Sequence, residues 1–172
     1  MKVKQDKLLE QYDFVDGDYI DKVKAKYAPS IGLFMVRFSS LEHTLDLCIA
    51  DGFNRGTHQL GYLIIEGMSL NSKIELFRKI FPGNRFVVRL RFTPETLVKR
   101  LHAVRVFRNY LAHANWNTLQ NTGYVRTKVG EKDSEIIFRK VRITPKVIKA
   151  WIQRVNELEE RLSDFEMSMQ DA

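Results

Sequence analysis

The sequence predicts a mainly α protein, an up-and-down bundle of four to five helices with one β-hairpin inserted before the last helix. Three observations support this fold class. Apolar residues recur three and four positions apart over several long segments, which is the period of a helix. Thr-Pro pairs at 93–94 and 144–145 are typical helix starts. Two short runs rich in β-branched residues precede the second pair and are typical of a hairpin.

The chain of 172 residues is expected to hold one domain, preceded by an arm. Residues 1–29 carry six Lys and six Asp or Glu, so we expect a loosely attached N-terminal arm with a short helix from Asp18 to Tyr27. Residues 30–172 are then the helical domain. Pro29-Ser30 is interpreted as the start of its first long helix, which runs to about Asp51. Its apolar positions are Ile31, Phe34, Met35, Phe38, Leu41, Leu45 and Ile49.

The middle of the domain is divided by glycine and proline. Residues 52–56 predict a turn, and residues 58–66 predict a short helix that ends before Gly67. Ser69 is expected to cap the next helix, which ends at Pro82-Gly83. Residues 84–92 are basic and are expected to be extended.

The remaining elements follow the two Thr-Pro pairs. Thr93 is expected to cap a helix that ends between residues 112 and 115. The hairpin is expected at about 123–142, and the last helix after Thr144. Apolar residues of that helix alternate three and four apart, which favours packing inside a bundle.

Several classes of protein are excluded by composition and motif. No apolar run reaches the roughly 18 residues of a membrane span, and the polar N-terminus resembles neither a secretory signal nor a transit peptide. The single cysteine, Cys48, lies among apolar residues, which favours burial in a reducing cytoplasm. Four histidines and one cysteine have no zinc-site spacing, and a phosphate-binding P-loop and a GxSxG elbow are absent. We expect a cytoplasmic protein with no metal, no cofactor and no membrane partner.

The positive charge is concentrated in one segment. The chain has a net charge of +7, and residues 73–108 hold ten Lys or Arg against Glu75 and Glu95. Such an excess favours a polyanionic partner such as nucleic acid, although a solvated basic surface has the same composition.

Two charged residues fall on apolar helix faces. Arg108 lies in the stripe of apolar residues of the helix after Thr93, and Glu42 lies in that of the first long helix. Because unpaired buried charges are costly, we predict that Arg108 and Glu42 contact each other. A plain salt bridge without chemistry is the alternative. His113 lies five residues after Arg108, about 140° around the helix, so the two converge only if the helix ends there or a second subunit contributes.

The stretch RNYLAH, from Arg108 to His113, resembles the signature of HEPN domains, an arginine followed by four to six residues and a histidine. The upstream FSSLEHTL, the middle segment LNSKIELFRKIF and the Thr-Pro start of the last helix are also similar to HEPN-type bundles. The resemblance covers roughly residues 30 to 168.

This resemblance implies a metal-independent endoribonuclease, often a toxin or an anti-phage abortive-infection effector, that forms a homodimer with its two motifs facing across a cleft. His113 would be the acid/base group, Arg108 would stabilise the charge on the phosphate, and Asn109 would hold the cleft geometry. RNA would supply the 2′-hydroxyl nucleophile. Further candidate phosphate ligands are His102, Arg105, Arg100 and Lys99.

Two questions stay open at this point. A neutralising antitoxin or another regulatory partner could bind the hairpin or the N-terminal arm. The competing interpretation is a non-catalytic helical module that binds RNA or protein, in which Arg108 and Glu42 are only a structural pair.

Overall fold

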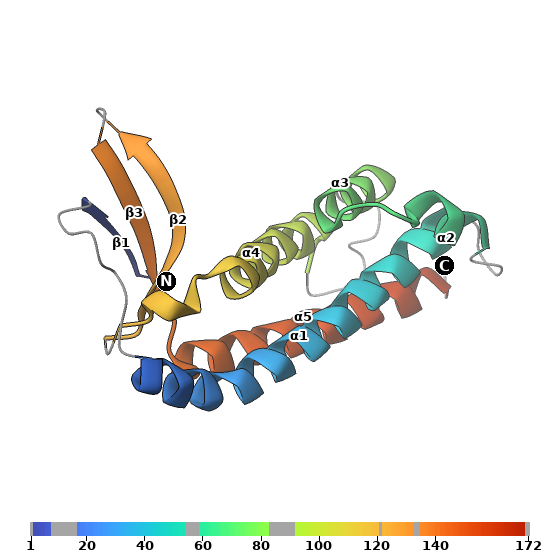
Figure 1. The fold of residues 1–172 in the computed structure, drawn as a ribbon. Coiled ribbons are helices and arrows are strands. Elements are labelled where there is room, and N and C mark those ends of the chain that lie inside the picture. The colour runs from blue at the N-terminus through green and yellow to red at the C-terminus, as the bar shows by residue number, and fades with distance from the viewer. Residues whose placement is uncertain are drawn as a thin grey trace. The chain divides into compact units, whose positions relative to one another are not determined.

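The computed structural model describes residues 2–7, 17–53, 59–82, 92–120, 122–132 and 135–170. These residues form five α-helices, one short 3-10 helix and three strands (Figure 1). In chain order the elements are β1 (Val3–Lys7), α1 (Gly17–Phe53), α2 (Gln59–Ile65), α3 (Leu70–Ile80), α4 (Pro94–His113), η2 (Trp116–Thr118), β2 (Tyr124–Lys132), β3 (Glu135–Arg142) and α5 (Pro145–Gln170). The predicted class, mainly α with a hairpin before the last helix, is confirmed.

Three helices start where the sequence predicts, and their caps explain why. The backbone N–H of Ser72 donates to the hydroxyl of Ser69 at 3.2 Å, which caps α3. Thr93 and Thr144 cap α4 and α5 in the same way, each accepting at 3.3 Å from the N–H three residues later. The predicted extended segment 84–92 lies almost wholly outside the described residues.

The start of the first helix was predicted wrongly. α1 begins at Gly17 and contains Pro29, which the sequence indicated as a helix start. A proline inside a helix removes one hydrogen bond and costs roughly 3 kcal/mol. Tertiary packing offsets this cost, because the Tyr27 ring lies 5.7 Å from that of Trp116 and its hydroxyl donates to the carbonyl of Ile143 at 3.4 Å. How firmly residues 1–29 are attached stays a prediction.

The chain divides into two compact units. Unit 1 comprises residues 1–34 and 107–150, and unit 2 comprises residues 35–106 and 151–172. Helices α1, α4 and α5 each contribute residues to both units.

Unit 1 contains a three-stranded antiparallel sheet in the order β1-β3-β2. The predicted hairpin forms its β2–β3 part, and β1 is an additional strand that the sequence analysis missed. Val141 at the centre of β3 pairs with Val3 on one side and with Val125 on the other. A bulge interrupts β2 between Arg126 and Lys128.

The end of α4 is joined tightly to the sheet of unit 1. The indole N–H of Trp116 donates to the carbonyl of Leu111 at 3.2 Å, and the N–H of Asn115 donates to the carbonyl of Arg126 at 2.8 Å. The Thr118 hydroxyl donates to the carbonyl of Asn115 and accepts from the N–H of Arg126. Because these bonds fix residues 111–118, they also fix the helix end that carries His113.

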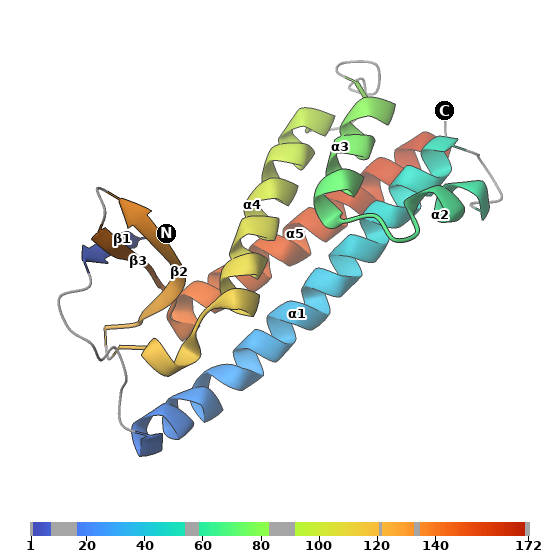
Figure 2. The same ribbon diagram turned by 45° about the horizontal axis from the view of Figure 1, so that its top comes forward.

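Unit 2 is held by an apolar core between its helices. The ring of Phe77 in α3 and the ring of Phe81, directly after α3, have their centres 5.4 and 5.0 Å from that of Phe165 in α5. Cys48 of α1 is buried and its thiol donates to the carbonyl of Leu162 in α5 at 3.5 Å, as expected from its apolar neighbours. Burial raises the pKa of this thiol far above its ordinary value. Within this unit α3 therefore packs on α5, and α5 packs on α1 (Figure 2).

A glycine allows α2 to approach α1 closely. A Cβ atom at Gly61 would clash with Cα of Ala50 and lie 2.7 Å from its Cβ. We expect Gly61→Ala to lower the free energy of unfolding by about 1–3 kcal/mol, measured by urea denaturation. Gly32→Ala is the matched control, since a Cβ there meets nothing within 4 Å and alanine favours helix by up to about 1 kcal/mol. Equal stability of the two variants would contradict the close packing.

Candidate functional site

The Arg108–His113 motif occupies the last turns of α4, in unit 1. The side chains of Arg108 and Asn109 are half-buried, and Nη1 of Arg108 donates to Oδ1 of Asn109 at 3.2 Å. The Asn109 amide therefore restrains the guanidinium of Arg108 through one of its N–H donors.

His113 is the last residue of α4, and its side chain is exposed. The N–H of Ala114 still bonds to the carbonyl of Tyr110, after which Asn115 forms a bridge to Arg126 of β2. The helix therefore ends directly after His113, within the range of residues 112–115 expected from the sequence. An exposed imidazole at a fixed position is accessible to a substrate.

The sheet of unit 1 contains cationic residues, and one of them, Arg126, bridges to Asn115 just after the end of α4. Arg126, the bridge partner of Asn115, lies opposite Lys140, and the next pair beyond the bulge is Lys128 opposite Arg139. The guanidinium of Arg126 lies 4.8 Å from the centre of the Phe138 ring. Like charges directly opposite each other destabilise a sheet. Lys140 is buried, whereas Lys128 and Arg139 are exposed to solvent. These residues were not predicted as part of the site, although both predicted strands contain the cations.

Glu42 has a partner that was not predicted. It belongs to unit 2, where its carboxylate accepts from the ammonium of Lys73 in α3 at 3.2 Å. Arg108 belongs to unit 1, so its contact with Glu42 stays a prediction. A signal for Lys73 was present in the sequence, because it directly precedes Ile74 and lies four residues before Phe77 on the apolar side of α3.

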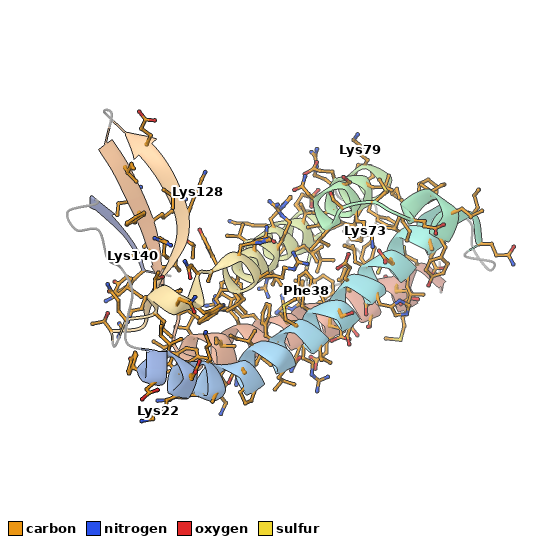
Figure 3. All side chains as sticks on the ribbon, viewed as in Figure 1. Lys22, Phe38, Lys73, Lys79, Lys128 and Lys140 are labelled. Carbon is orange, nitrogen blue, oxygen red and sulfur yellow. The ribbon has the colours of Figure 1, made fainter. Side chains whose placement is uncertain are left out.

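Lys73, labelled in Figure 3, forms a largely buried charge cluster with two carboxylates of α1, those of Glu42 and Asp46. Its side chain is 11% exposed and its ammonium also donates to Oδ2 of Asp46 at 2.8 Å. Oδ1 of Asp46 is buried without a hydrogen-bond partner in the described part of the chain. The cluster lies at a cavity of about 620 Å³ lined by Asp46 and Lys73 together with residues of α2 and the turn that follows it.

The charges in this cluster shift one another's pKa values. Burial pulls the pKa of Lys73 down, but the hydrogen bonds and charges of Asp46 and Glu42 outweigh it and raise the pKa above its ordinary 10.5. Burial raises the pKa of Asp46 against the opposing effect of Lys73. Lys73 thus stays charged at neutral pH, while burial makes the charged form of Asp46 less favourable.

The four predicted phosphate ligands, all in the unit 2 part of α4, differ in their surroundings. The imidazole of His102 lies 3.4 Å from Glu75 of α3, which also accepts two hydrogen bonds from Arg78. The side chain of Arg105 is half-buried, and that of Lys99 is exposed. Arg100 lines a groove with residues of α5. Of the four, His102 is the one with a carboxylate contact described in this part of the chain, and Arg100 shares its groove with Glu157 of α5.

No helix within the described ranges is long and apolar enough to cross a membrane. Within the same ranges, no three His, Cys, Asp or Glu side chains gather into a set that could hold a metal ion. Comparison of the chain with protein-family models, curated proteins and solved structures found no match. The resemblance to HEPN domains stays an expectation from the sequence.

Proposed function

We propose that this chain is a metal-independent endoribonuclease whose site is formed by Arg108, Asn109 and His113. The observation that carries the proposal is the arrangement at the end of α4. A half-buried guanidinium restrained by Asn109 precedes an exposed imidazole, and the residues that follow join a sheet rich in cations. An acid/base group and a fixed positive charge are the two requirements of RNA cleavage by the 2′-hydroxyl.

The proposed reaction needs no activated nucleophile from the protein. The bond between the 2′-oxygen and phosphorus forms while the bond from phosphorus to the 5′-oxygen breaks. A histidine accepts the proton of the 2′-hydroxyl, and a second acid gives a proton to the leaving 5′-oxygen. Arg108 stabilises the added negative charge on the phosphorane, since a guanidinium matches two phosphate oxygens.

The need for a second acid leads us to propose a dimer. His113 and Arg108 lie about 140° apart on an ideal helix, and one chain contains one such histidine. Two copies with their motifs facing would supply two imidazoles and two guanidinium groups to one phosphate. Such a ribonuclease fits a cytoplasmic toxin or anti-phage effector held in check by an antitoxin or another partner.

A second candidate function is binding of RNA without cleavage. The arginine-lined groove of unit 2, where Arg100 lies, favours it because such a groove can hold RNA with no catalytic group. In that case Arg108 has a structural role only.

Cleavage of a mixed RNA pool in EDTA separates the two functions. Wild type, Arg108→Ala and His113→Ala are incubated with the pool, and fragments are counted on a denaturing gel. Fragmentation by wild type that is lost in both variants supports the nuclease. Intact RNA with wild type, at concentrations where RNA is bound, supports the binding module.

A further inference from the structure

A groove between α4 and α5 of unit 2 has a lining suited to a nucleotide. Arg100 and Val104 of α4 lie on one side, and Trp151, Arg154 and Glu157 of α5 lie on the other. Its volume is about 340 Å³, near the lower end of the roughly 300–1,000 Å³ that ligand pockets occupy. The groove can therefore hold one nucleotide rather than a folded partner.

The groove contains a preformed stack. The guanidinium of Arg154 lies 4.7 Å from the centre of the Trp151 ring, and the Arg154 side chain is exposed while Trp151 is half-buried. The Trp151 ring restrains the guanidinium plane of Arg154 by a cation–π contact. A ligand that stacks on the other face of this guanidinium therefore loses little entropy by ordering it. Single-stranded RNA bases stack on arginine planes in this way.

The charges of the groove select an anion and can recognise a base. Arg100 and Arg154 carry two positive charges against the one negative charge of Glu157. Arginine presents a planar fork of donors that matches two phosphate oxygens. A carboxylate accepts hydrogen bonds only, so Glu157 suits the amino group of a base.

We infer that the α4–α5 groove binds one nucleotide of single-stranded RNA, its base stacked on Arg154 and its phosphate bound by Arg100. This inference takes RNA as the ligand from the proposed function, but it does not require that the RNA is cleaved. It assigns a role to Arg154, Trp151 and Glu157, which the motif at the end of α4 leaves unused.

Tryptophan fluorescence tests this groove directly. The chain has two tryptophans, so Trp116→Phe leaves Trp151 as the single reporter. The probe is a mixed-sequence hexanucleotide with 2′-O-methyl groups, which cannot be cleaved through its 2′-oxygen. We expect a saturable change in Trp151 fluorescence, and about 10-fold weaker binding in Arg100→Ala and in Arg154→Ala made in the same background.

Two further variants keep the test specific. Lys149→Ala removes an exposed charge from α5 outside the groove and is expected to bind within about twofold of its parent. Arg154→Lys keeps the charge but loses the plane, and it is expected to bind as weakly as Arg154→Ala. Melting temperatures confirm that each variant is folded.

The outcomes separate this inference from the proposed function. Binding that is lost in the groove variants, without cleavage of unmodified RNA by wild type, supports the groove and contradicts the nuclease. Cleavage by wild type, with equal binding by Arg100→Ala, Arg154→Ala and Lys149→Ala, overturns the groove and leaves the nuclease standing. An unchanged Trp151 signal on RNA binding also overturns it.

Discussion

Replacing His113 by alanine is expected to lower the rate of RNA cleavage by about 10²–10⁴-fold, the contribution of a positioned acid/base group. The side chain is exposed, so the free energy of unfolding should stay within about 0.5 kcal/mol of wild type. Single-turnover cleavage of an end-labelled RNA measures the first quantity, and urea denaturation measures the second.

His43 supplies the matched control for this prediction. It is an exposed histidine of α1, and His43→Ala removes the same group from a helix outside the motif. We expect it to cleave RNA at the wild-type rate. Equal rates for His113→Ala and His43→Ala would remove His113 from the mechanism.

Replacing Lys73 by methionine is expected to destabilise the fold by roughly 3 kcal/mol at pH 7, because a buried ion pair that loses one partner leaves an uncompensated charge. The variant keeps a side chain of similar length but leaves Glu42 and Asp46 facing each other without a cation. Acid should reduce the difference from wild type, since burial raises the pKa of Asp46 and protonation of this carboxyl removes its repulsion with Glu42. Urea denaturation at pH 7 and at about pH 4 measures both effects.

The raised pKa of Lys73 also predicts how stability changes at alkaline pH. A group whose folded pKa lies above its unfolded value stabilises the fold below that unfolded value, and the contribution is lost as pH rises through the folded pKa. Wild type should therefore lose stability above about pH 10.5, and Lys73→Met should not share this loss.

Lys79→Ala is the control for the Lys73 variant, since Lys79 is exposed on the same helix. Its stability should stay within about 0.5 kcal/mol of wild type at each pH. If Lys73→Met were as stable as this control at pH 7, the buried cluster would contribute nothing to the fold.

Local signals in the sequence predicted most elements of the fold. Ser69, Thr93 and Thr144 mark three helix starts because a hydroxyl that accepts from the N–H three residues on is a local feature. The hairpin followed from two adjacent β-branched runs in the same way. Features that depend on distant residues were missed. β1 pairs with residues 137–141 of β3, and no local pattern in its five residues indicates that partner.

In the candidate site, too, features set by neighbouring residues were predicted and contacts between distant residues were not. The place of His113 at the end of α4 was predicted, since small and polar residues follow it. Lys73 could be seen on an apolar face, but its acidic partners depend on how α3 packs against α1. The stack of Arg154 on Trp151 joins residues three apart on one helix, so the spacing alone could have indicated it.

We propose above all that the chain cleaves RNA through the 2′-hydroxyl without a metal. The most direct measurement is mass spectrometry of a defined RNA incubated with purified protein in EDTA, beside the same sequence carrying 2′-O-methyl groups throughout. We predict fragments with a 2′,3′-cyclic phosphate and a 5′-hydroxyl from the first RNA, and no fragments from the second. Intact RNA in both reactions, or cleavage of the 2′-O-methyl strand, would contradict the claim.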